Sequence, residues 1–342
     1  MITWRMSIDF KCFEENAAET LYRVALEQAA WADARGVTQI WVDEHHGSQN
    51  LTSPLAMAAA VGAVTRRARI GVGCLLLPLL DPIRVAEDAI TADLVSQGRL
   101  EIIAGLGYVP HEFEMYGVSL RDRARLMDEK LPVLLDCLAG RPFEYRGRRG
   151  RVLPLPFQKP RPPVLVGGAV EASARRAARL GDGFAPAADD PVLYDLYLAE
   201  CERLGRAPGP IRKPGYPLYV FVSRDPERAW ARLAPHLLHE VNQYAGWSAA
   251  GNRPRIGYVL DHGQQEELAN LRRKPNFGVL TPEECVALAR SKPDGAHLAF
   301  KPTRTGLDVD LGWESLELFV SDVLPHIEIA PPAPMAPVRD AG

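Results

Sequence analysis

Residues 38–46 read TQIWVDEHH, an apolar segment followed at once by carboxylates and imidazoles. Because its centre, Ile40–Val42, is apolar on both faces, the segment is typical of a strand buried in a parallel sheet. Similar segments recur along the chain, with helical stretches between them. We expect the other strands at Trp4–Phe10, Arg69–Leu77, Arg99–Ala104, Val164–Gly167, Gly183–Pro186, Leu218–Val222 and Ala296–Lys301.

The starts of the intervening helices are well marked. Ser53-Pro54 and Asp81-Pro82 each place a capping side chain before a proline at the first helical position. Thr281–Glu284 has the pattern of a capping box. Eight strand–helix units in 342 residues predict a (β/α)8 TIM barrel. A doubly wound sheet is the alternative, but it usually carries GxGxxG after its first strand, and this chain does not.

We expect a single barrel domain over residues 1–329, with two insertions. Residues 141–163 begin with an Arg/Gly-rich hairpin and continue as an extended, proline-rich segment. Residues 242–278 are polar and weakly periodic, which favours a long loop, or a loop with a helix, near the mouth of the barrel. The proline-rich tail, residues 330–342, is expected to be mobile.

Composition excludes several classes of protein. The chain has 40 Lys and Arg against 43 Asp and Glu, so it lacks the basic excess of a nucleic-acid-binding protein. No apolar run approaches the roughly 18 residues that span a bilayer, and the N-terminus does not resemble an export signal. The five cysteines are widely spaced, which indicates reduced thiols. We therefore expect a cytoplasmic protein without a membrane or nucleic-acid partner.

Three polar residues follow the expected strand at Thr38–Asp43. In a barrel, the carboxyl ends of the strands form the active-site face, so Glu44, His45 and His46 are candidates for proton transfer. Because neighbouring residues alternate in direction along a strand, only one of the two histidines is expected to face the site. We favour His45 as the acid/base, with Glu44 as its orienting group, and keep His46 as the alternative.

A second candidate lies after the strand at Val164–Gly167. Gly168, Ala169 and Val170 lead into a helix, and Ser173 adds a hydroxyl in its first turn. Glycines permit close approach of a ligand to the backbone, and the amides at a helix start attract phosphate. We expect an anion site here, with the side chain of Glu171 facing solvent; a plain strand-to-helix turn is the alternative.

Two further patterns favour structural interpretations. His236–Glu240 resembles a metal-binding helix face but matches neither HExxH nor HxxEH, so we expect no metal site. The basic cluster of residues 146–151 is typical of a solvated hairpin, although an anionic ligand is an alternative.

Several motifs together resemble the bacterial luciferase-like family of flavin-dependent oxidoreductases and monooxygenases. The similarity is carried by their order and spacing over most of residues 1–190. The segments concerned are Trp41–His46, Arg69–Gly73 with Leu77-Pro78, Asp81-Pro82, Ala86–Asp88, Ser96–Arg99, Gly105–Tyr108, Glu112-Phe113, Tyr116-Gly117, Pro156–Pro160, Ala174–Gly183 and Thr281–Glu284.

The resemblance implies an enzyme with a TIM barrel, often dimeric, that uses reduced FMN with dioxygen. The Glu-His-His form is closer to the monooxygenase branch, so we expect oxygenation of a small organic substrate. A separate flavin reductase would supply reduced FMN, because no NAD fingerprint is present. One alternative is hydride transfer with a deazaflavin coenzyme; another is a non-catalytic flavin-binding protein.

The resemblance also implies specific cofactor contacts. A non-proline cis peptide backs the flavin ring in the family, and the matching bond here joins Gly73 and Cys74, after Val72. Where luciferase has a cysteine and an arginine, this chain has Gly105 and Leu106, so light emission from a long aldehyde is not expected. The flavin phosphate is expected near Gly168, Ala169, Val170 and Ser173, with Tyr108 as a further donor.

Overall fold

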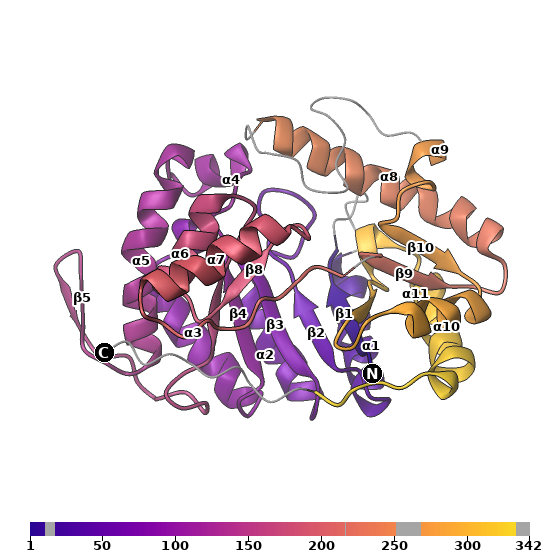
Figure 1. Ribbon diagram of the computed structural model, residues 1–342, viewed down its shortest axis with the longest axis horizontal. Helices are drawn as coiled ribbons and strands as arrows, with labels where there is room; N and C mark the ends of the chain where they lie inside the picture. Colours follow the sequence, from indigo (N-terminus) through magenta and orange to yellow (C-terminus); the bar gives the residue numbers. More distant parts are fainter. Residues whose placement is uncertain (11–17, 216, 251–267, 333–342) are drawn as a thin grey trace. The chain divides into compact units, whose positions relative to one another are not determined.

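The computed structural model describes residues 1–10, 18–215, 217–250 and 268–332, and the chain forms two compact units. Each unit contains parallel strands and helices, which Figure 1 colours along the sequence. The α/β class expected from the alternating pattern is therefore confirmed. Among the described residues, the first unit consists of Met1–Thr52, Val64–Arg69 and the chain from Gly215 onward, and the second consists of Ser53–Ala63 and Ile70–Pro214.

The first unit contains parallel strands in the order β11-β1-β2 and a separate parallel pair, β9 with β10. The strands are β1 (Thr3–Ile8), β2 (Gln39–Val42), β9 (Tyr219–Val222), β10 (Phe277–Leu280) and β11 (His297–Phe300). The helices are α1 (Ala18–Ala34), α8 (Pro226–Ala250), α9 (Leu268–Leu271), α10 (Pro282–Ser291) and α11 (Val309–Leu318).

Aromatic side chains form the centre of this unit beside β1 and β11. Trp4 is fully buried, and its ring lies 5.0 Å from that of Phe319 and 6.4 Å from that of Phe300. Large buried rings contribute strongly to core stability. This packing fixes the two strands whose carboxyl ends carry Asp9 and Lys301.

The second unit contains parallel strands in the order β3-β4-β7-β8. They are β3 (Arg69–Leu75), whose first residue belongs to the other unit, β4 (Leu100–Ala104), β7 (Val164–Gly168) and β8 (Phe184–Pro186). The helices are α2 (Pro54–Val64), α3 (Pro82–Val95), α4 (Pro110–Met115), α5 (Arg123–Leu138), α6 (Glu171–Leu180) and α7 (Pro191–Arg203).

The expected hairpin is present in the second unit. β5 (Phe143–Tyr145) and β6 (Arg148–Gly150) pair in antiparallel fashion. Its arginines form exposed ion pairs: Arg148 with Asp81, and Arg149 with Glu144. The basic cluster is thus a solvated hairpin, as the structural interpretation of the sequence predicted.

The structure confirms two of the helix starts that capping residues predicted. Asp81 accepts hydrogen bonds from the amides of Ile83 and Arg84 at the start of α3. Thr281 and Glu284 cap α10 reciprocally, with distances of 3.2 and 2.9 Å. Among the described helices, none has the length and apolar character needed to cross a membrane.

All eight expected strands are present, each within two residues of its expected bounds. Closure of these strands into a full TIM barrel stays a prediction. The sequence did not predict β10, because the four residues Phe277–Leu280 are too few to show the alternation of apolar and polar residues typical of a strand. Of the expected insertion at 242–278, residues 242–250 belong to α8 and residues 251–267 lie outside the described part of the chain. Most of the expected tail, residues 333–342, also lies outside it.

Candidate functional site

The histidine segment, Glu44–His46, lies in the first unit, one residue after the end of β2. The backbone amide of His45 donates to the carbonyl of Leu51 at 3.0 Å, which fixes the turn after the strand. Glu44, His45 and His46 are all buried, with relative exposures of 4, 8 and 2 %. Buried polar side chains require hydrogen-bond partners, and the partners of these three distinguish their roles.

His45 contacts two aromatic residues of α8. Its Nε2 lies 3.1 Å from the hydroxyl oxygen of Tyr244. The imidazole also packs on the indole of Trp247, with ring centroids 4.7 Å apart and an interplanar angle of 34°. The sequence did not predict either contact, because both residues lie in the segment expected to be an insertion.

His46 and Glu44 form a pair of their own. His46 Nε2 lies 3.0 Å from Glu44 Oε1, and both side chains are almost completely buried. Glu44 was expected to orient His45, but the carboxylate contact in the structure is with His46. Alternation along an extended segment explains this pairing, because residues two apart point to the same side.

A second charged pair lies at the ends of neighbouring strands β1 and β11. Lys301 Nζ donates to Asp9 Oδ2 at 2.9 Å, and Asp9 is 2 % exposed. Sequence reasoning did not single out these residues. Each is the first residue after its strand, and this shared position is the signal that could have identified them.

In the second unit, small residues meet at the carboxyl ends of β3, β4 and β7. The peptide bond between Gly73 and Cys74 is cis, as the family resemblance predicted. A Cβ atom at Gly105 would lie 2.7 Å from Cys74 Cβ, and one at Gly167 would lie 3.1 Å from Cys74 Sγ. A side chain at Gly105 would therefore displace Cys74, and Gly167 leaves little room for one. Val72, also expected to contact the cofactor, has a fully buried side chain.

The turn into α6 is tightly built. A Cβ atom at Gly168 would lie 2.3 Å from Ser173 Cβ, so this position excludes any side chain. The Ser173 hydroxyl donates to the Val170 carbonyl at 2.5 Å and accepts from the Val170 amide at 3.2 Å. Ser173 thus caps the helix with the hydroxyl that was expected to hold phosphate.

Other expected neighbours of this turn differ in exposure. Ala169 and Tyr108 are half-buried, with the hydroxyl oxygen of Tyr108 itself buried, and Glu171 is 72 % exposed, in agreement with its expected orientation toward solvent. The first backbone amides of a helix have no partner within the helix. The start of α6 therefore offers backbone amides, rather than a side-chain hydroxyl, to an anion.

No metal centre is supported by the described residues. They contain no group of three or more His, Cys, Asp or Glu side chains arranged to hold a metal ion. His239 lies on α8, where burial lowers the pKa of its imidazole. This burial suits a packed helix position.

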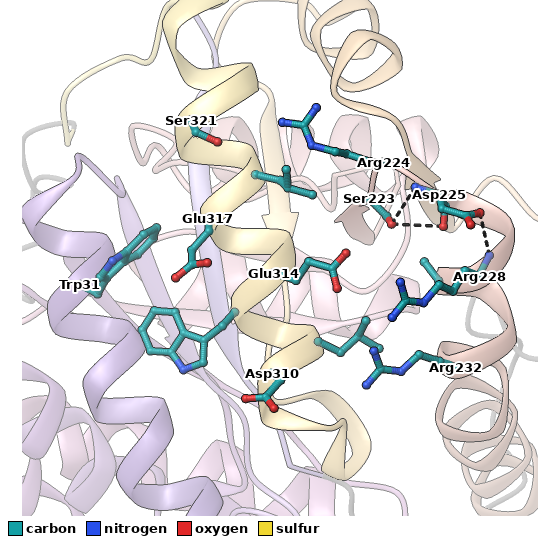
Figure 2. A pocket seen from close by; sticks show the side chains of 14 residues that line it. Trp31, Ser223, Arg224, Asp225, Arg228, Arg232, Asp310, Glu314, Glu317 and Ser321 are labelled. Carbon is teal, nitrogen blue, oxygen red and sulfur yellow. Dashed lines mark hydrogen bonds between the residues drawn. The ribbon is translucent and has the colours of Figure 1, made fainter.

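An open groove of about 980 Å³ lies within the first unit, lined by α1, α8 and α11 (Figure 2). One wall carries Arg224, Arg228 and Arg232, and the other carries Glu314 and Glu317. Arg224 and Arg232 are already paired, with Asp322 and Asp308 respectively. The groove contains none of the site residues expected from the sequence.

Comparisons with known proteins agree with the resemblance. The oxygenase component of a flavin-dependent trigonelline monooxygenase from Acinetobacter baylyi is 28 % identical over 163 residues, 45 % of each chain. This chain spans about half the length of the curated relatives it matches.

Solved structures share the fold. Monooxygenase RslO1 from Streptomyces bottropensis has a TM-score of 0.74 at 23 % identity, covering 95 % of this chain and 99 % of its own. An F420-dependent secondary alcohol dehydrogenase has a TM-score of 0.65 at 18 % identity, covering 95 % and 99 %.

The family model described as luciferase-like monooxygenase matches residues 6–289, which include the histidine segment, the cis peptide and the turn into α6. The chain belongs to the luciferase-like monooxygenase family.

Proposed function

We propose that this protein is a flavin-dependent monooxygenase that uses reduced FMN and dioxygen to oxygenate a small organic substrate. Family membership and the flavin-dependent relative support this reaction class. The observation that carries the proposal is a group of small residues at the ends of β3, β4 and β7 in the second unit. We call this group, Gly73, Cys74, Gly105, Gly167 and Gly168, the flavin bed.

The bed fits the flat ring system of a flavin. Gly73, Cys74 and Gly168 are half-exposed, and none has a side chain larger than a thiol. A planar ring can therefore approach the strand ends closely. The backbone amides at the start of α6 suit the phosphate of FMN, and Tyr108 is a candidate for a further contact. When bound, reduced FMN supplies the chemistry that activates dioxygen.

His45 is proposed as the acid/base of the protein. It follows a buried strand, its backbone is fixed by Leu51, and a histidine ordinarily exchanges protons near neutral pH. The Glu44–His46 pair then acts as support for the turn that carries it. Asp9 and Lys301, also at strand ends of the first unit, are candidates for polar contacts with substrate.

A separate flavin reductase is proposed as a partner, because the trigonelline relative is described as an oxygenase component. We also keep the expectation of a homodimer, which comes from the family resemblance. Hydride transfer with a deazaflavin coenzyme is the second candidate function, favoured by the shared fold of the F420-dependent dehydrogenase.

Adding a side chain at Gly105 tests whether this group of small residues binds the flavin. In Gly105→Ala, the new methyl group must displace Cys74, because their Cβ atoms would lie 2.7 Å apart. We expect the affinity for reduced FMN to fall at least tenfold, measured by anaerobic fluorescence titration.

Gly62→Ala is the matched control. Its Cβ would lie 2.9 Å from Ser96 Cβ in the same unit, between α2 and the end of α3, so the crowding is similar. We expect this variant to bind reduced FMN like the wild type. Equal losses of affinity in both variants, or no loss in Gly105→Ala, would exclude the proposed bed.

A further inference from the structure

The histidine segment of the first unit is covered by one face of α8. Tyr244 and Trp247 lie three residues apart, so they project from neighbouring positions on the same side of the helix. The two rings contact each other in a T-shaped arrangement at 5.3 Å, and each contacts the imidazole of His45. The rings of His45, Tyr244 and Trp247 are therefore all in mutual contact.

A buried ion pair anchors the same helix one turn earlier. Arg304 Nη2 donates to Glu240 Oε1 at 2.5 Å, its Nε lies 2.5 Å from Oε2 in the same ion pair, and the two side chains are 3 and 1 % exposed. Two-point contacts of this kind fix orientation as well as distance. Glu240 and Tyr244 are four residues apart, so the ion pair fixes α8 one turn before the phenol.

The chemistry of the two groups sets the direction of the hydrogen bond. A phenol O–H is a stronger acid than a neutral imidazole N–H, and an imidazole nitrogen is a better acceptor than a phenol oxygen. With Tyr244 Oη and His45 Nε2 separated by 3.1 Å, the favoured arrangement has the phenol donating. The imidazole proton then resides on Nδ1.

We infer that Tyr244 is the positioning residue of His45: its hydroxyl selects the Nδ1–H tautomer, while the Trp247 indole fixes the plane of the ring. The part of this inference that concerns catalysis rests on the proposed function. It gives His45 one defined protonated nitrogen in its neutral state. The role expected for Glu44 thus belongs to a residue 199 positions away in the sequence.

The tautomer can be measured directly in the full chain without a cofactor. Nitrogen-15 NMR distinguishes protonated from unprotonated imidazole nitrogens, and the His45 signals are identified by their loss in His45→Gln. We expect the wild-type protein to carry its proton on Nδ1. In Tyr244→Phe, we expect the ratio of the Nε2–H to the Nδ1–H form to rise about two- to tenfold, the effect of losing one hydrogen bond.

Tyr219→Phe is the matched control. Tyr219 is a buried tyrosine of β9 in the same unit, and among the described residues its hydroxyl has no hydrogen-bond partner. This variant should leave the His45 tautomer unchanged. A wild-type His45 protonated on Nε2 would overturn the inference even if Tyr244→Phe failed to fold. An unchanged ratio in a folded Tyr244→Phe would overturn it as well.

The same variants separate this inference from the proposed function. If the tautomer changes as expected but the chain does not bind reduced FMN, the positioning role stands and the proposed function fails. If reduced FMN binds but the tautomer does not respond to Tyr244→Phe, the positioning role fails and the proposed function stands.

Discussion

His297, at the start of β11, has an unusually acidic imidazole. Burial lowers its pKa to about 3, and the positive charges of Arg5 and Lys292 act in the same direction. An unfolded histidine titrates near 6.5. Protonation therefore favours the unfolded chain, and the contribution of His297 to stability is complete above pH 6.5 and falls as the pH drops toward 3.

Removing this imidazole should flatten the acid side of the stability profile. We expect the unfolding free energy of His297→Gln, from denaturant titrations, to fall less than that of the wild type between about pH 7 and pH 4. Between about pH 7 and pH 9, the two profiles should run parallel. Identical profiles below pH 6.5 would show that His297 is not the group concerned.

The two histidines after β2 require separate tests. Removing a positioned acid/base typically lowers turnover 10²- to 10⁴-fold. We expect this loss in His45→Ala, with binding of reduced FMN retained. His46→Ala should lower turnover much less, although it leaves Glu44 without its 3.0 Å contact. A collapse of turnover in His46→Ala alone would reverse the assignment.

Local patterns account for some side-chain contacts and not for others. The contact between Glu44 and His46 was not predicted, although the alternation of side chains along a strand is a signal that could have indicated it. The contact between His45 and Tyr244 has no local signal, because it joins residues 199 positions apart and depends on how α8 packs. The cis bond after Gly73 was predictable only through the family resemblance.

Strands and helices lie where the sequence predicted them when their apolar patterns or capping residues were clear. Strands rich in apolar residues and helices with capping side chains were located within a few residues, as for α3 and α10. β10 has only four residues, too few for an apolar/polar alternation that would predict a strand. The end of α8 carries polar residues beside Tyr244 and Trp247, so its apolar face was hidden in the pattern.

A buried ion pair connects elements of the second unit. Arg161 donates to both carboxylate oxygens of Asp182 at 2.6 and 3.0 Å, and Asp182 also accepts from the backbone amide of Val164 at the start of β7. Both side chains are almost completely buried. Asp182 therefore ties the proline-rich segment and β7 to the turn before β8.

Removing the carboxylate should leave a buried, uncompensated guanidinium. We expect Asp182→Ala to lower the free energy of unfolding by about 3–5 kcal/mol, measured by chemical denaturation. Glu144→Ala, which breaks the exposed pair with Arg149, should cost less than about 1 kcal/mol. Similar losses in the two variants would contradict the role assigned to burial.

At the scale of the whole molecule, alternation of strands and helices predicted the α/β class and the positions of the strands. The division into two compact units was not predicted, because it joins segments far apart in the sequence. Substrate identity is also not encoded in local patterns, since it depends on side chains that several elements bring together. The family, by contrast, follows from motifs whose order is preserved along the chain.

The central claim is that this chain binds reduced FMN for reaction with dioxygen. The most direct measurement is an anaerobic titration of the purified protein with reduced FMN and, in parallel, with the reduced deazaflavin, followed by admission of dioxygen. We predict saturable binding of reduced FMN, weak or no binding of the deazaflavin, and protein-dependent oxygen consumption with bound FMN. Binding of the deazaflavin alone, without oxygen consumption, would contradict the account.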